Sequence, residues 1–165
     1  MRPGDAAAPA ETSVSLHGRI LIVDDEGAIL FSMKEYFTGR GFAVDCAQEM
    51  EEAEALLEAR EYDAAIVDLR LTGTNCIEGL EIVECIKDHW PGTRIILLTA
   101  YGSPEIETEA RIRGIDAFLQ KPMPLSAVER IVYEVLGVRH DVRSSHEVLV
   151  VRDECHRSQP QGGSD

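Results

Sequence analysis

Residues 20–25 read Ile-Leu-Ile-Val-Asp-Asp, an unbroken apolar run that ends in two carboxylates. A strand that is apolar at every position is typical of a parallel sheet covered by helices on both faces. Two further runs have the same form, AAIVD at residues 64–68 and IILLT at residues 95–99. Together these runs predict a buried parallel sheet at the centre of the protein.

Short apolar runs alternate with segments of helical period from Arg19 to about Gly137, which is typical of βα units. We predict strands at Ile20–Val23, Ala43–Cys46, Ala64–Val67, Ile95–Leu98 and Ala117–Leu119. We predict helices at 27–39, 48–59, 79–89, 104–113 and 125–136, the fourth of which begins at Ser103-Pro104 and ends at Gly114. This alternation, with right-handed crossovers, predicts an α/β fold: a three-layer (βα)5 doubly wound parallel sheet.

The chain of 165 residues has room for one compact domain with loose ends. We expect a flexible N-terminal arm over 1–17, the folded domain over 18–138 and a mostly disordered tail over 139–165. The tail contains Val-Leu-Val-Val at 148–151, so an extra strand or a docking peptide stays open there. The tail is too short for a second packed domain, and a DNA-binding domain is therefore not expected.

Composition disfavours several functional classes. A formal net charge of −14 argues against direct binding of nucleic acid, which needs clustered Lys and Arg. The four cysteines (Cys46, Cys76, Cys85 and Cys155) show no CxxC spacing, so we expect reduced thiols and neither a disulfide framework nor a zinc site. The longest apolar runs are too short to span a bilayer. We therefore expect a cytoplasmic protein without membrane insertion.

Polar residues stand at the ends of four predicted strands. They are Asp24, Asp25 and Glu26 after the first strand, Asp68 after the third, Thr99 after the fourth and Lys121-Pro122 after the fifth. In an open α/β sheet the ligand binds at the carboxyl ends of the strands, so these side chains are expected to meet. Asp24 taken alone could equally be a helix N-cap, whereas the whole set indicates a shared site.

The residue types in this set suit phosphoryl transfer assisted by a metal ion. Three neighbouring carboxylates need a compensating cation, because like charges raise one another's pKa. Oxygen ligands in an open crevice suit Mg²⁺. A carboxylate facing the metal can attack phosphorus to give an aspartyl phosphate, and the Lys121 ammonium and Thr99 hydroxyl can bond the phosphoryl oxygens.

The segments ILIVDDE (20–26), AIVDLRL (65–71), IILLTA (95–100) and FLQKPM (118–123) resemble the receiver domain of two-component response regulators. The resemblance covers about residues 18–138 and implies a flavodoxin-like sheet with strand order 2-1-3-4-5. It also implies roles for the matching residues. Asp68 would be the phosphoacceptor, Asp25 a direct Mg²⁺ ligand, Asp24 a ligand mainly through bound water, and Arg70 a ligand through its backbone carbonyl. Thr99 would be the switch hydroxyl, Phe118 the switch aromatic, and Lys121, before a cis Pro122, the phosphate contact.

The implied function is that of a phosphorelay response regulator. Asp68 would take its phosphoryl group from a sensor histidine kinase, a phosphotransfer protein or a small phosphodonor. The phosphate would draw Thr99 inward, and Phe118 would fill the space that Thr99 leaves. The face over 103–136 would then bind a downstream protein or a second copy of the chain. Beyond Mg²⁺-dependent self-phosphorylation and slow autodephosphorylation, no enzymatic activity is expected.

Two features depart from the usual pattern of the family. The loop LTGTNCIEG (71–79) lacks the usual proline and is a few residues longer, so we expect altered kinase docking or access to Asp68. Bulky side chains, Arg70 and Tyr101, stand two residues beyond Asp68 and Thr99, where family members line the path of the hydrolytic water. We hypothesise that they shield the acyl phosphate; the alternative is that both point into solvent.

Three alternative functions are a phosphatase, a dinucleotide-binding protein and a phosphorylation-independent interaction module. A phosphatase of the haloacid-dehalogenase type needs a second aspartate two residues after the nucleophile, and Arg70 stands there, which cannot donate a proton. A dinucleotide-binding fold is disfavoured because the first strand–helix turn is acidic rather than glycine-rich. A receiver-like interaction module that ignores phosphorylation stays open.

Overall fold

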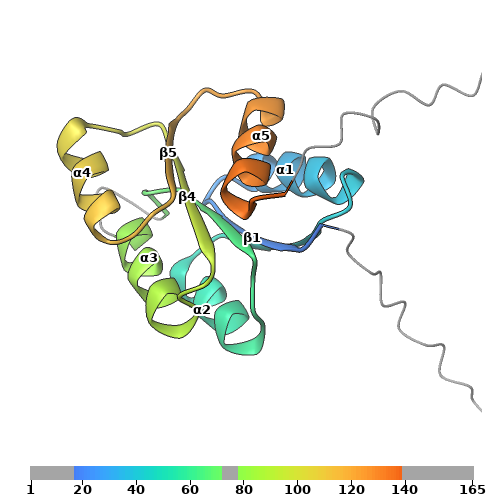
Figure 1. The fold of residues 1–165 in the computed structure, drawn as a ribbon, viewed down its shortest axis with the longest axis horizontal. Coiled ribbons are helices and arrows are strands. Elements are labelled where there is room, and N and C mark those ends of the chain that lie inside the picture. The colour runs from blue at the N-terminus through green and yellow to red at the C-terminus, as the bar shows by residue number, and fades with distance from the viewer. Residues whose placement is uncertain (1–16, 72–77, 139–165) are drawn as a thin grey trace, which may run out of the picture.

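The computed structural model describes residues 17–71 and 78–138, in which five strands alternate with five helices (Figure 1). The elements are β1 (Arg19–Val23), α1 (Gly27–Gly39), β2 (Ala43–Ala47), α2 (Met50–Ala59), β3 (Ala64–Val67), α3 (Glu78–His89), β4 (Arg94–Thr99), α4 (Pro104–Ile112), β5 (Ala117–Gln120) and α5 (Leu125–Leu136). All strand pairs are parallel, in the order β2-β1-β3-β4-β5. The predicted fold and strand order are confirmed. The predicted arm, the predicted tail and residues 72–77 of the long loop lie outside the described residues.

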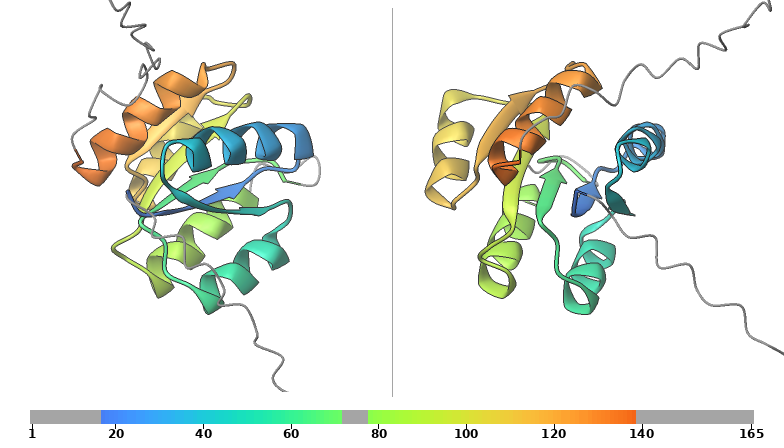
Figure 2. Two further views of the ribbon diagram at one scale, coloured as in Figure 1. Left: turned by 90° about the vertical axis from the view of Figure 1, so that its right-hand side faces the viewer. Right: turned by 45° about the vertical axis from the view of Figure 1, so that its right-hand side comes forward.

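The sheet separates two apolar cores, because successive side chains of a strand point to opposite faces. Ile20 and Ile22 of β1 pack in a cluster with α1 and α5. Leu21 and Val23 of the same strand pack in a second cluster with α2, α3 and α4. Figure 2 shows these two groups of helices on opposite sides of the sheet. Burial of β1 on both faces explains why its sequence is apolar at every position.

Some boundaries differ from the prediction by one or two residues. β4 is longer than predicted, so Thr99 is the last residue of the strand rather than the first after it. Pairing with β5 explains the extension, since Thr99 is in register with Gln120 and its carbonyl accepts the N–H of Lys121 at 2.9 Å. α2 begins at Met50, two residues later than predicted, because Glu49 before it is still extended.

The helix-end signals of the sequence are confirmed at both ends of α4. The hydroxyl of Ser103 accepts the N–H of Ile106 at 3.3 Å, and Pro104 occupies the first turn. Beyond the helix, Gly114 has a φ of 94°, which a side chain would disfavour. Within the described ranges, no helix is both long and apolar enough to cross a bilayer.

A half-buried carboxylate on β2 ties this edge of the sheet together. Asp45 accepts hydrogen bonds from the hydroxyl of Tyr62 at 3.0 Å, from Arg19 at 3.1 Å and from Arg60 at 3.2 Å. Burial opposes the charge of Asp45, but these donors hold its pKa below the ordinary value. The ionised carboxylate therefore stabilises the fold.

Candidate functional site

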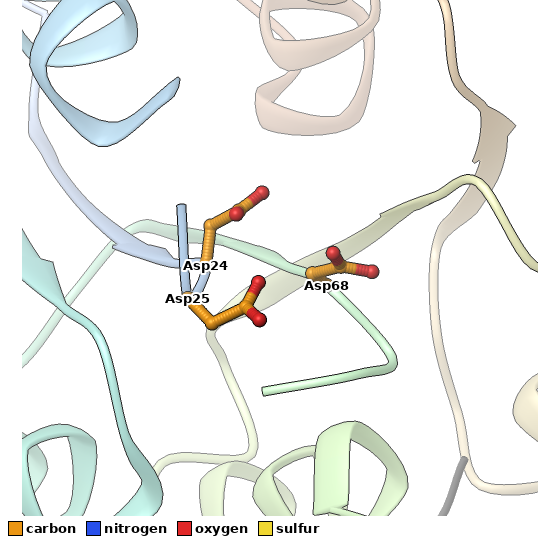
Figure 3. A group of neighbouring side chains, drawn as sticks. All are labelled: Asp24, Asp25 and Asp68. Carbon is orange, nitrogen blue, oxygen red and sulfur yellow. The ribbon is translucent and has the colours of Figure 1, made fainter. Parts of the chain in front are cut away.

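Three aspartates meet at the carboxyl ends of two neighbouring strands. Asp24 and Asp25 follow β1 and Asp68 follows β3; the N–H of Asp68 donates to the carbonyl of Val23 at 2.9 Å. One carboxylate oxygen from each of the three lies within 4.8 Å of the others (Figure 3). Asp24 and Asp68 are buried, whereas Asp25 is exposed. The predicted cluster is therefore present, with one open carboxylate and two sheltered ones.

Lys121 reaches two of these aspartates from β5, at the edge of the sheet. It follows β5, and its Nζ donates to Asp24 Oδ2 at 2.6 Å and to Asp68 Oδ2 at 3.1 Å. Burial opposes its charge, but the hydrogen bond to Asp24 and the charge of Asp68 hold the pKa of Lys121 above its ordinary value. Its bond to Pro122 is cis, as the resemblance implied. The ammonium is thus held between two carboxylates.

Asp24 has two partners in this arrangement. Besides Lys121, it accepts the N–H of Glu26 at 2.9 Å through Oδ1, at the turn that leads into α1. Burial raises the pKa of Asp24, and the bond from Lys121 offsets part of that rise. The N-cap of α1 is Glu26, so the interpretation of Asp24 as a helix N-cap is wrong; Asp24 instead supports the turn that precedes the helix and belongs to the aspartate cluster.

Thr99 and Phe118 lie on one face of the sheet, on neighbouring strands. Thr99 is fully buried at the end of β4, and its hydroxyl accepts the N–H of Tyr101 at 3.1 Å. Phe118 pairs with Leu97, two residues before Thr99, so both side chains point to the side of α3 and α4. The ring of Phe118 is half-buried and lies so close to Gly102 that a Cβ there would be 2.9 Å from its Cε1.

Arg70 and Tyr101 stack on each other at the edge of the site. The guanidinium carbon of Arg70 lies 3.5 Å from the centroid of the Tyr101 ring. Both side chains line a cavity of about 320 Å³, together with Asp25, Glu26, Asp68, Ala100 and Lys121. The pair is therefore part of the wall around the phosphoacceptor candidate, while Tyr101 is also half-exposed to solvent.

Gly79 was missed by the sequence analysis. Its N–H donates to the carbonyl of Leu69 at 3.2 Å, and a Cβ on it would lie 2.6 Å from Leu69 Cα and would also contact the carbonyl oxygen of Asp68. Glycine thus lets the first turn of α3 approach the backbone that carries Asp68. A glycine in a first helical turn, where its propensity is poor, is the signal that could have indicated this contact.

The donor set fits a divalent cation with oxygen ligands. Every group in the cluster is a carboxylate, and the cluster opens onto the cavity beside Asp25. Mg²⁺ prefers such ligands and keeps some of its water, which an open site allows. The acidic cluster is therefore suited to Mg²⁺.

A family model for the response regulator receiver domain matches residues 20–133. The chain belongs to this family. A receiver domain protein of Methanospirillum hungatei is 33% identical with a TM-score of 0.68, and the match covers 72% of this chain and 93% of that one. A response regulator of Burkholderia pseudomallei, crystallised with a phosphorylated aspartic acid, a calcium ion and citrate, is 27% identical with a TM-score of 0.66, over 72% of this chain and 68% of that one.

Curated relatives of this receiver are regulatory proteins. The alginate biosynthesis transcriptional regulatory protein AlgB of Pseudomonas aeruginosa is 34% identical over 129 residues, which are 78% of this chain and 28% of AlgB. The chain spans less than two thirds of the curated relatives that it matches first. The family and the fold together make the chain a response regulator receiver of the phosphorelay type.

Proposed function

We propose that Asp68 accepts a phosphoryl group from a phosphohistidine on a sensor histidine kinase or phosphotransfer protein. The observation that carries the proposal is the meeting of Asp68 with Asp24, Asp25 and Lys121, brought from three separate strand ends. The regulator of Burkholderia pseudomallei, whose structure contains a phosphorylated aspartic acid and a calcium ion, supports it by likeness.

In the proposed reaction a carboxylate oxygen of Asp68 attacks phosphorus, and the phosphorus–nitrogen bond of the donor breaks with its electrons moving to the histidine nitrogen. Asp25, Asp68 and the backbone carbonyl of Arg70 would hold a Mg²⁺ ion directly, and Asp24 would hold it mainly through bound water; the ion would supply the positive charge that lets an anionic donor approach these carboxylates. Lys121 already donates to Asp68, and it needs only a small shift to donate to a phosphoryl oxygen on that residue.

The phosphorylated state is proposed to act through Thr99 and Phe118. The Thr99 hydroxyl, which accepts from Tyr101, still has its own proton to donate to a phosphoryl oxygen on Asp68. Movement of Thr99 toward that oxygen opens space on the face where Phe118 lies, and the apolar ring fills it. The face over 103–136 then changes shape and binds a downstream protein or a second copy of this chain.

The stack of Arg70 on Tyr101 is proposed to lengthen the life of the acyl phosphate. Both side chains line the cavity that a hydrolytic water must enter to reach Asp68.

The chain itself turns over no separate substrate: it takes a phosphoryl group and loses it slowly. The described cysteines, Cys46 and Cys85, are free thiols, which supports action in the reducing cytoplasm.

Incubation with acetyl phosphate and Mg²⁺ tests the proposal, with intact mass and peptide mapping as the readout. We expect one phosphate on Asp68, none in Asp68→Asn, and none in the wild type when the metal is chelated. Asp88→Asn, a change on the exposed side of α3, is the matched control and should be phosphorylated like the wild type. Equal phosphorylation of Asp68→Asn would contradict the proposal, and no phosphorylation at all would favour the phosphorylation-independent interaction module.

A further inference from the structure

A cavity of about 160 Å³ lies between α2 and α3, away from the aspartate cluster, and is lined by Glu54, Leu57, Glu58, Cys85 and His89. The two helices pack side by side (Figure 1). α3 begins beside Asp68, and His89 comes ten residues after Gly79, which is about 15 Å further along the helix axis. The cavity is therefore separate from the site of the proposed phosphorylation.

Cys85 and His89 lie one turn apart on α3 and are in contact. The Sγ of Cys85 lies 3.8 Å from Nδ1 of His89, and that nitrogen lies 2.9 Å from the carbonyl oxygen of Cys85. A carbonyl oxygen can only accept, so in the neutral imidazole this bond puts the proton on Nδ1 and leaves the lone pair on Nε2. Metal-binding histidines are oriented in this way, with the second ring nitrogen donating to a carbonyl or carboxylate.

Glu54 and Glu58 face the same cavity from α2, also one turn apart. Neither carboxylate has a hydrogen-bond or ion-pair partner among residues 17–71 and 78–138. Their charges act on the Cys85 thiol, where burial first and then Glu54, Asp88 and Glu58 raise the pKa. The cavity thus combines a thiol, an imidazole and two unpaired carboxylates in a negative field that attracts cations.

We propose that Cys85 and His89, completed by a carboxylate of Glu54 or Glu58, bind Zn²⁺ and so clamp α2 to α3. Thiolate, imidazole and carboxylate are the ligands that zinc prefers, whereas the all-oxygen aspartate cluster suits a harder ion. A glutamate side chain has to rotate toward the pair, because among the described residues only the aspartate cluster holds three such groups within 4.8 Å. Binding displaces the thiol proton to solvent.

The proposal revises the expectation drawn from the cysteines. The absence of CxxC spacing excludes one common zinc motif, but Cys85 and His89 are four residues apart, a spacing that the helix converts into a contact. It is independent of the phosphorylation of Asp68.

Titration of the full chain with Co²⁺, with excess Mg²⁺ to occupy the aspartate cluster, tests the site. We expect one equivalent to produce a thiolate-to-cobalt charge-transfer band that Zn²⁺ abolishes by displacement. Cys85→Ser should lose the band, and His89→Gln and the double variant Glu54→Gln/Glu58→Gln should bind at least about tenfold more weakly. Cys46→Ser, which removes a free cysteine on β2, is the matched control and should keep the band.

Thermal unfolding supplies a second readout. Zn²⁺ should raise the Tm of the wild type and of Cys46→Ser but not that of Cys85→Ser, because only a metal bound to the folded state stabilises it. Absence of the band in the wild type, or its persistence in Cys85→Ser, would overturn the site. Undiminished binding by the double glutamine variant would overturn the clamp between α2 and α3.

Discussion

The Lys121 side chain lies between the carboxylates of Asp24 and Asp68. The substitution Lys121→Met keeps its apolar stem and removes its positive charge. Lys121 Nζ lies 2.6 Å from Asp24 and 3.1 Å from Asp68, and the three side chains are 15%, 4% and 8% exposed, respectively. Removing one partner of a buried ion pair destabilises a protein by about 3–5 kcal/mol, since the other charge stays buried without compensation. This cluster opens onto a surface cavity, which admits water. We therefore expect a loss of roughly 2–3 kcal/mol in the free energy of unfolding without Mg²⁺.

A double-mutant cycle with Asp24→Asn separates the ion pair from simple packing. The amide carries no charge to compensate, so the combined variant Asp24→Asn/Lys121→Met should be more stable than Lys121→Met by about 1 kcal/mol or more. Urea unfolding followed by circular dichroism, with a chelator present, measures all four proteins. Lys34→Met on the exposed side of α1 is the control and should change stability by less than about 0.5 kcal/mol. The reasoning is refuted if Lys121→Met is as stable as the wild type or if the two single changes are additive.

Three further expectations concern Asp45, Gly79 and the stack of Arg70 on Tyr101. Asp45→Asn should lower the free energy of unfolding by about 1 kcal/mol at neutral pH. In urea titrations, this difference between the variant and the wild type should vanish as the pH falls from 3.8, the ordinary pKa, through the lowered pKa of Asp45. The reason is that the carboxylate stabilises the folded state only while it is ionised. Gly79→Ala should destabilise by about 2 kcal/mol, since its methyl group overlaps the backbone beside the phosphoacceptor, whereas Gly39→Ala, with no atom within 4 Å of the new methyl, should be neutral or slightly stabilising by the same assay. Arg70→Ala, Tyr101→Ala and the double variant should each lose the acyl phosphate up to about fivefold faster, because the stack acts as one unit of roughly 1 kcal/mol; an unchanged rate of phosphate release in the double variant would count against shielding.

The helical and strand segments could be predicted because each is a property of neighbouring residues. Ile20–Val23 is apolar throughout, and a strand with that pattern must be covered on both faces, which in a chain of alternating strands and helices leaves few folds. The site residues could be predicted for a related reason: parallel strands end at one edge, so the polar residues that end them are brought together. Boundaries such as Thr99 were less accurate, because pairing with β5 rather than local composition decides where β4 ends.

What the sequence alone determined is therefore the order of the elements, the parallel sheet and the set of residues at its carboxyl edge. The tertiary structure decided which of those residues touch. Lys121 is 97 residues from Asp24 and 53 from Asp68, yet it donates hydrogen bonds to both. Arg70, which follows β3, stacks on Tyr101, which follows β4. Gly79 lets the first turn of α3 lie against the backbone of Asp68. Local sequence patterns determine the type of each element and which of its faces is apolar. A contact at 3 Å depends instead on the register between distant elements, which is set only when the whole core packs.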